Sequence, residues 1–119
     1  MTSRVGQGFY RQELFRKFSG KCAVTGNDLE EILIASHIVP WRLSSDEERL
    51  DPDNGILLSP LYDALFDKHI ITFADDGTME VSEQFTERLS NLNIDKNLKI
   101  DVSEGMKKYL RRHREQFRK

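Results

Sequence analysis

The sequence has few of the residues that would indicate a disulfide, a zinc site or a membrane span. Its 119 residues include a single cysteine, Cys22, which excludes an internal disulfide and a four-cysteine zinc site. Cys22 is therefore expected to pack as a small hydrophobic residue. No apolar run approaches the ~20 residues that a membrane-spanning helix needs. The chain does not open on a signal-peptide pattern, so the expected compartment is the cytoplasm.

The length of the chain limits how many domains it can form. A chain of 119 residues can bury roughly two thirds of its unfolded surface around one core. Its 38% hydrophobic and 32% charged residues are typical of a soluble protein. We therefore expect a single domain over residues 1–119.

The charge is unevenly distributed along the chain, although its net value is only -2. The middle is acidic, whereas many of the basic residues lie in two terminal blocks. Such a pattern would let the ends hold a polyanion and the centre hold a cation, but it is also typical of solvated terminal helices. The basic blocks consist of Arg4, Arg11, Arg16, Lys17 and Lys21, and of Lys107, Lys108, Arg111, Arg112, Arg114, Arg118 and Lys119.

Hydrophobic periodicity and turn residues predict the elements of the first half. A helix is expected over 8–18, where Phe9, Leu14, Phe15 and Phe18 recur at helical spacing. Short strands are expected over 21–25 and 32–39, and Pro40 ends the second because it cannot donate to a strand ladder. Residues 42–53 are polar and aperiodic, which predicts a loop.

The second half begins with a strong helix-start signal. Ser59 as N-cap and Pro60 at the first helical position predict a helix over 60–68. Residues 70–73 and 79–82 flank a turn and predict a β-hairpin. Residues 83–101 are expected to form a short helix and an extended return. A basic helix capped by Ser103 should then run to about residue 117, with Met106, Tyr109, Leu110, His113 and Phe117 along one stripe.

Three polar features follow one another at the centre of the chain. His37 ends a predicted strand, Asn54 follows the loop, and Asp63 and Asp67 lie four residues apart on one helix face. A lone strand histidine is ordinarily a half-buried ring bonded to backbone, and two such aspartates are ordinarily a solvent-facing acidic stripe. Together, however, they provide a base to activate water and hard oxygen ligands for Mg²⁺ or Mn²⁺. Phosphodiester hydrolysis requires both.

Four segments resemble the HNH endonuclease family: "CAVTG", "ASHIVPWR", "DPDNGILLSPLYDALFD" and "IITFADDGTMEVS". The similarity extends from about Gly6 to the terminal "YLRRHREQF". The resemblance implies an α+β fold with a ββα-metal core over about residues 20–82. An N-terminal helix would precede this core, and a β-hairpin and a basic C-terminal helix would follow it.

The resemblance also implies a role for each matching residue. His37 matches the family's general base, and Asn54 matches a residue whose side-chain amide braces the backbone near that histidine. Asp63 stands where the final motif histidine usually lies, and Asp67 follows one turn later, so both would bind the metal. Asp63 replaces nitrogen with oxygen and favours Mg²⁺, whereas Ser36 occupies a third ligand position but is a poor ligand.

Several other residues have more than one possible role. Arg42, Lys68, Arg111 and Arg112 are expected to contact nucleic-acid phosphate, although each could be a plain surface charge. His69 could join Asp67 as a ligand only if the helix ends at Lys68. His113 would pack against the protein or contact phosphate. Trp41 and Pro40 are expected to pack under the metal loop.

The expected function is cleavage of DNA by a restriction-type endonuclease that uses one divalent ion, Mg²⁺ or alternatively Mn²⁺, and no structural zinc. Either Asp63, Asp67, water and DNA phosphate together hold the cation, or the protein has a low affinity for the cation until it binds DNA. The alternative is a DNA-binding or interaction module that retains the HNH fold without efficient chemistry. The expected partners include DNA and no membrane. By resemblance, the chain could be the C-terminal domain of a larger restriction protein, and a concerted double-strand cut would need a homodimer.

Overall fold

The computed structural model describes residues 7–118. Arg4, Gly6 and Lys119, which the sequence analysis includes, lie outside this range. The described elements are two small antiparallel sheets and several helices, so the α+β class is confirmed. They are α1 (Gln7–Lys17), β1 (Ile34–His37), α2 (Asp46–Leu50), β2 (Gly55–Leu58), α3 (Pro60–Asp67), β3 (Ile71–Phe73), β4 (Met79–Val81), α4 (Thr86–Leu89) and α5 (Lys107–Glu115).

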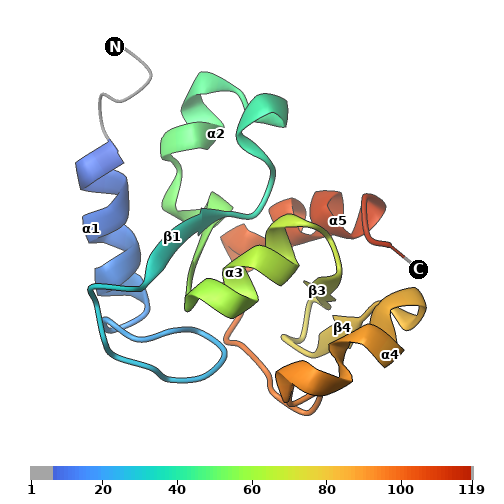
Figure 1. Cartoon of the computed structure of the whole chain (residues 1–119). Helices are drawn as coiled ribbons and strands as arrows, with labels where there is room; N and C mark the ends of the chain where they lie inside the picture. The colour runs from blue at the N-terminus through green and yellow to red at the C-terminus, as the bar shows by residue number, and fades with distance from the viewer. Residues whose placement is uncertain (1–6, 119) are drawn as a thin grey trace.

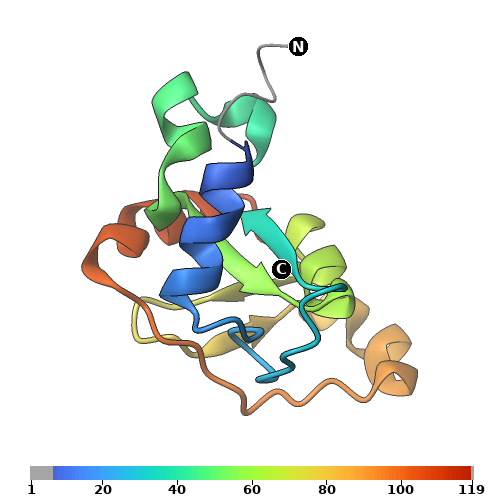
Figure 2. The same cartoon turned by 90° about the vertical axis from the view of Figure 1, so that its left-hand side faces the viewer.

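The hairpin of β1 and β2 lies between α1 and α3, as Figures 1 and 2 show from two sides. Its register pairs Ser36 with Ile56 and His37 with Gly55. All four residues of β2 are buried because the strand passes through the centre of the hydrophobic core. The hairpin therefore fixes where the end of β1, including His37, meets the rest of the domain.

Helix α3 packs one face into the core and leaves the other free for polar groups. Tyr62, Leu65 and Phe66 are buried, whereas Asp63 is half-buried and Asp67 is exposed. The helix begins at Pro60 with Ser59 in the N-cap position, as predicted, although the Ser59 side chain makes no capping hydrogen bond. Apolar spacing on α3 therefore places both aspartates away from the core.

The second sheet and α5 complete the core. The predicted hairpin is confirmed as β3 and β4, and α5 packs against β3. The basic C-terminal helix is confirmed but is shorter than predicted: a 3-10 turn, Glu104–Met106, precedes α5, with Ser103 in its N-cap position. Of the predicted stripe, Met106, Tyr109, Leu110 and His113 are buried. Residues 83–101 form α4, its flanking 3-10 turns and an extended return. Within this return, Lys99 forms a β-bridge with Thr78, just before β4.

Two predicted elements are wrong. The expected strand over 21–25 is a turn, closed by hydrogen bonds from Cys22 N to Asn27 O and from Gly26 N to Cys22 O. The expected loop over 42–53 contains α2, flanked by 3-10 turns at Trp41–Leu43 and Pro52–Asn54. Helix α2 has no buried residue, so it lacks the apolar periodicity from which the other helices were predicted. A capping box between Ser45 and Glu48 starts it instead.

The face of α1 that meets the core differs from the predicted one. Phe9 is 61% exposed, whereas its neighbour Tyr10 is 1% exposed and lies against the hairpin.

Cys22 is buried and free, as expected of a small hydrophobic residue, and its sulfur accepts hydrogen bonds from the backbone of Thr25 and Ser59. Among residues 7–118, no helix is long and apolar enough to cross a membrane.

Replacing Gly55 with alanine is expected to destabilise the domain by ~1–3 kcal/mol. A Cβ at this position would collide with the Tyr10 hydroxyl and with Leu14, both of which pack against β2. Urea unfolding monitored by circular dichroism would measure the loss. Gly8→Ala is the matched control because nothing lies within 4 Å of a Cβ there. Equal midpoints for the two variants would contradict the close packing of α1 on the hairpin.

The buried His113 is expected to make the fold sensitive to acid. Burial, together with the charges of His69 and Arg114, lowers its pKa from 6.5 to about 3, although the hydrogen bond to Phe66 O opposes this shift. Because the folded pKa lies below the unfolded one, the stabilisation is complete above pH 6.5 and is lost as the pH falls towards 3. The free energy of unfolding should fall by up to about 1.4 kcal/mol per pH unit for this proton.

Urea unfolding midpoints between pH 7 and pH 5 measure this dependence. We expect a flatter pH profile for His113→Phe, although this variant is less stable at pH 7 because it loses hydrogen bonds to Thr72 and Phe66. Thr72→Val is the control, since it removes one of those bonds and keeps the titrating ring. Parallel profiles for the wild type and His113→Phe would exclude His113 as the source.

Candidate active site

His37 is held at the end of β1 by one hydrogen bond and two aromatic neighbours. Its Nε2 lies 2.7 Å from the backbone carbonyl of Arg49, and because a carbonyl only accepts, Nε2 carries the proton. The ring stacks on Tyr10 at 4.5 Å between centroids and meets Trp41 edge-on. Burial lowers the pKa of His37, although the hydrogen bond with Arg49 raises it. The neutral ring therefore has its lone pair on Nδ1, as a base requires.

Asn54 lies in the interior next to this histidine and is 0% exposed. Its Oδ1 accepts a hydrogen bond from the backbone N–H of Val39, two residues after His37. Its Nδ2 donates to the Ser44 hydroxyl and to the backbone carbonyl of Glu48. The side chain thus links the end of β1 to α2, which carries the carbonyl that orients His37.

Asp63 and Asp67 interact with each other on the exposed side of α3. Burial raises the pKa of Asp63, a hydrogen bond from the Ser36 side chain lowers it, and the negative charge of Asp67 raises it again. Ser36 is itself buried and immediately precedes His37 on β1. The structure therefore joins Ser36, Asp63 and Asp67, while His37 contacts Tyr10, Trp41 and Arg49.

His69 lies beside Asp67 because the helix ends before it. Helix α3 ends at Asp67, Lys68 is the C-cap, and His69 has a left-handed backbone with φ of 60°. Burial lowers the pKa of His69, whereas the charge and backbone of Asp67 raise it. Its Nε2 is buried and has no hydrogen-bond partner, and its ring stacks on His113 at 4.1 Å. Because α3 ends before His69, the condition for pairing His69 with Asp67 is met.

The donor set fits a hard divalent cation that retains part of its water shell. Two carboxylates share one helix face, and their mutual repulsion is the kind that a cation relieves. Within residues 7–118, however, no group of three or more His, Cys, Asp or Glu side chains is arranged to hold a metal ion. Mg²⁺ commonly binds through one or two carboxylates plus water and substrate phosphate, so these residues suit Mg²⁺ better than zinc.

The predicted nucleic-acid contacts fall into two groups. Arg42 and Arg118 both lie close enough to His69 to lower the pKa of its ring. Arg42 is exposed. Arg118 also donates a hydrogen bond to the backbone carbonyl of Lys68, which is itself exposed. Both arginines therefore lie near His69, just beyond the Asp67 end of α3. On α5, Arg111 is exposed, whereas Arg112 is occupied by an ion pair with Glu48 at 2.7 Å. Of the two histidine alternatives, His113 packs: it is 1% exposed and stacks on Phe66.

Several residues around the site have a role there that could not be predicted from the sequence alone. Tyr10, which stacks on His37, is placed there by the packing of α1, and the Arg49 carbonyl by α2. The Ser45-Glu48 capping box was the signal that could have revealed α2. Arg118 has no comparable local signal because its contact with Lys68 joins positions 50 residues apart.

A small α+β domain with a neutral histidine at a strand end, a buried asparagine and a helical pair of carboxylates has the groups of a nuclease. Residues 22–74 match the model of a family described as HNH endonuclease, which confirms the resemblance seen in the sequence. This segment is similar to HNH endonuclease domains, which points to nuclease activity in general. The match covers β1, β2, α3 and β3, whereas α1 and α5 lie outside it. No curated protein matches the chain.

Proposed function

We propose that this protein is a metal-dependent DNA endonuclease whose β1, β2 and α3 form a ββα-metal site of restriction type. The observation that carries the proposal is the pair of adjacent residues at the end of β1. Ser36 bonds the carboxylate of Asp63, and His37 next to it is neutral and oriented with its Nδ1 lone pair free. Successive strand side chains point to opposite faces, and Ser36 meets Asp63 of α3 whereas His37 meets Tyr10 of α1. The proposal therefore requires the metal ion and DNA to bring the base and the carboxylate pair together at the end of β1.

In the proposed reaction, Nδ1 of His37 takes a proton from a water molecule while the water oxygen attacks the scissile phosphorus. The bond from phosphorus to the 3′ oxygen breaks and this oxygen takes a proton from solvent water, so the products are a 5′ phosphate and a 3′ hydroxyl. Asn54 keeps the end of β1 and α2 together during this step. Asp63 and Asp67 would hold the divalent ion, which when bound stabilises negative charge on the phosphate and the departing oxygen.

The cations around α3 support a nucleic-acid substrate. Arg42, Lys68 and Arg118 come from separate parts of the chain and gather near Asp67 and His69. They would hold phosphates on either side of the bond that is cut, and the exposed Arg111 on α5 would add a more distant contact. Because phosphate contacts carry no sequence information, these residues would position DNA without selecting a site.

The second candidate is a DNA-binding module that has lost efficient chemistry. The absence of a group of three or more His, Cys, Asp or Glu side chains arranged for a metal, among residues 7–118, favours it. Incubating supercoiled plasmid with the protein in Mg²⁺ or Mn²⁺, with EDTA as the control, separates the two candidates. Metal-dependent conversion to nicked or linear DNA is the result that we expect. DNA binding in a gel-shift assay without such conversion would establish the module instead.

A further inference from the structure

We propose that Tyr109 and Arg112 of α5 are positioning residues for His37, although neither touches a reacting atom. They hold the segment 41–54, which runs from the 3-10 turn at Trp41 through α2 to Asn54 and carries the carbonyl that orients the base. This inference deepens the proposed nuclease function and rests on it, because it concerns the efficiency of the base.

Segment 41–54 is not fixed by hydrophobic burial. Its first turn and α2 have no buried residues, and Leu43 and Leu50 are 44% and 40% exposed. Helix α2 has five residues, which is too short to be stable alone. Only Ser44 and Asn54 are buried, so polar contacts must hold the segment in place.

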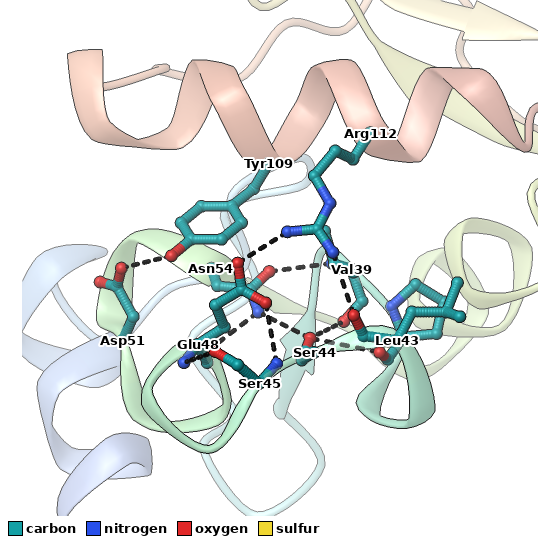
Figure 3. Close-up of polar contacts among 10 residues, drawn as sticks. Val39, Leu43, Ser44, Ser45, Glu48, Asp51, Asn54, Tyr109 and Arg112 are labelled. Carbon is teal, nitrogen blue, oxygen red and sulfur yellow. Dashed lines mark hydrogen bonds and ion pairs between the residues drawn. The ribbon is translucent and has the colours of Figure 1, made fainter.

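Helix α5 supplies three such contacts, and Figure 3 shows Tyr109 and Arg112 pointing from α5 toward segment 41–54. Arg112 Nη1 donates to the Glu48 carboxylate at 2.7 Å, and Nη2 donates to the backbone carbonyl of Leu43 at 3.0 Å. The Tyr109 hydroxyl donates to Asp51 Oδ2 at 2.6 Å. Because Glu48 and Asp51 flank Arg49 in sequence, these bonds restrain the carbonyl that meets His37.

Helix α5 is itself fixed in the hydrophobic core, so it can hold these contacts in place. Leu110 and, in the turn just before the helix, Met106 are 0% exposed, and His113 donates from Nε2 to the carbonyl of Phe66 on α3. The same helix therefore anchors the carboxylate-bearing α3 on one side and segment 41–54 on the other. Asn54 holds the segment from inside the protein, and α5 holds it from outside.

Loosening the segment would free Nε2 of His37 from its acceptor. The ring would then exchange between its two tautomers, and the one with a proton on Nδ1 cannot take a proton from water at that atom. We expect Arg112→Gln to lower kcat by about 10- to 100-fold, because misplaced reacting groups commonly cost that much, while KM for DNA changes little. A phosphate-binding role for Arg112 would instead raise KM and leave the tautomer unchanged.

Arg114→Gln provides a matched control on the same helix. Arg114 also donates to one backbone carbonyl and one carboxylate, those of Phe73 and Asp75, but these belong to the β3–β4 hairpin rather than segment 41–54. Both variants lose one charge and the same kinds of contact, so their effects on stability should be similar. Of these two arginine variants, only Arg112→Gln should alter His37. Tyr109→Phe removes a single hydroxyl and serves as a milder variant if Arg112→Gln fails to fold.

The deciding measurement is the ¹⁵N NMR spectrum of the His37 ring in metal-free, DNA-free protein at pH 7.5. We expect one tautomer with the proton on Nε2 in the wild type and in Arg114→Gln, and a mixture in Arg112→Gln and Tyr109→Phe. An unchanged tautomer in both Arg112→Gln and Tyr109→Phe, or an equal change in Arg114→Gln, would overturn the proposal. Absence of cleavage by the wild type would overturn the nuclease function alone, since the spectrum still decides whether α5 positions the ring.

Discussion

Replacing His37 with alanine is expected to reduce the rate of metal-dependent DNA cleavage by ~10²–10⁴-fold, the usual contribution of a general base. The neutral ring, with Nε2 bonded to the Arg49 carbonyl, is the group that would accept the proton of the attacking water. DNA affinity should change little, because the ring that is removed is neutral and contributes no positive charge. Nicking of supercoiled plasmid under single-turnover conditions measures the rate, and a gel shift measures binding.

Loss of the Tyr10 stack makes a stability control necessary for this variant. His37→Ala should unfold in urea at a slightly lower midpoint than the wild type and keep the same circular dichroism spectrum. Tyr10→Leu is the companion variant, since it removes the stacked ring and keeps the imidazole. If His37→Ala cleaves DNA as fast as the wild type, His37 is not the base.

Replacing both Asp63 and Asp67 with asparagine is expected to reduce cleavage by about 10²-fold or more, because it removes the negative charge that holds the divalent ion. The same change should not destabilise the metal-free protein. Burial and the charge of Asp67 raise the pKa of Asp63, so the ionised pair is unfavourable without a cation. Loss of activity without loss of stability would identify the pair as a binding site rather than a structural element.

Thermal unfolding with and without Mg²⁺ measures the binding directly. The wild type should unfold at a higher temperature in Mg²⁺ than in EDTA, whereas the double variant should unfold at the same temperature in both. Glu80→Gln removes an exposed carboxylate on β4 and should behave as the wild type. An undiminished Mg²⁺-dependent shift in the double variant would place the ion elsewhere in the protein.

The elements that could be predicted from the sequence are those with strong local signals. The Ser59-Pro60 pair located the start of α3, and the apolar spacing along α5 located its buried face. The spacing of four between Asp63 and Asp67 was sufficient to place both on the same side of α3. In each case, the geometry follows from helical periodicity alone.

Other parts of the site depend on contacts between distant residues. The stack of Tyr10 on His37 joins α1 to β1, and Phe9 was indistinguishable from Tyr10 as the inward aromatic residue. Helix α2 escaped prediction because it buries no side chain and is held by its cap and by α5. The position of His69 depended on where α3 ends, and its left-handed backbone could not be deduced from a histidine at that position.

The central claim is that His37 and the pair of Asp63 and Asp67 serve one catalytic centre. The most direct test is a crystal structure of the protein soaked in Mn²⁺, with the ion located by its anomalous scattering. The account predicts an anomalous peak bound by the oxygens of Asp63 and Asp67, with Nδ1 of His37 facing a water molecule near that ion. A peak away from both carboxylates, or an Nδ1 directed away from the ion, would contradict it.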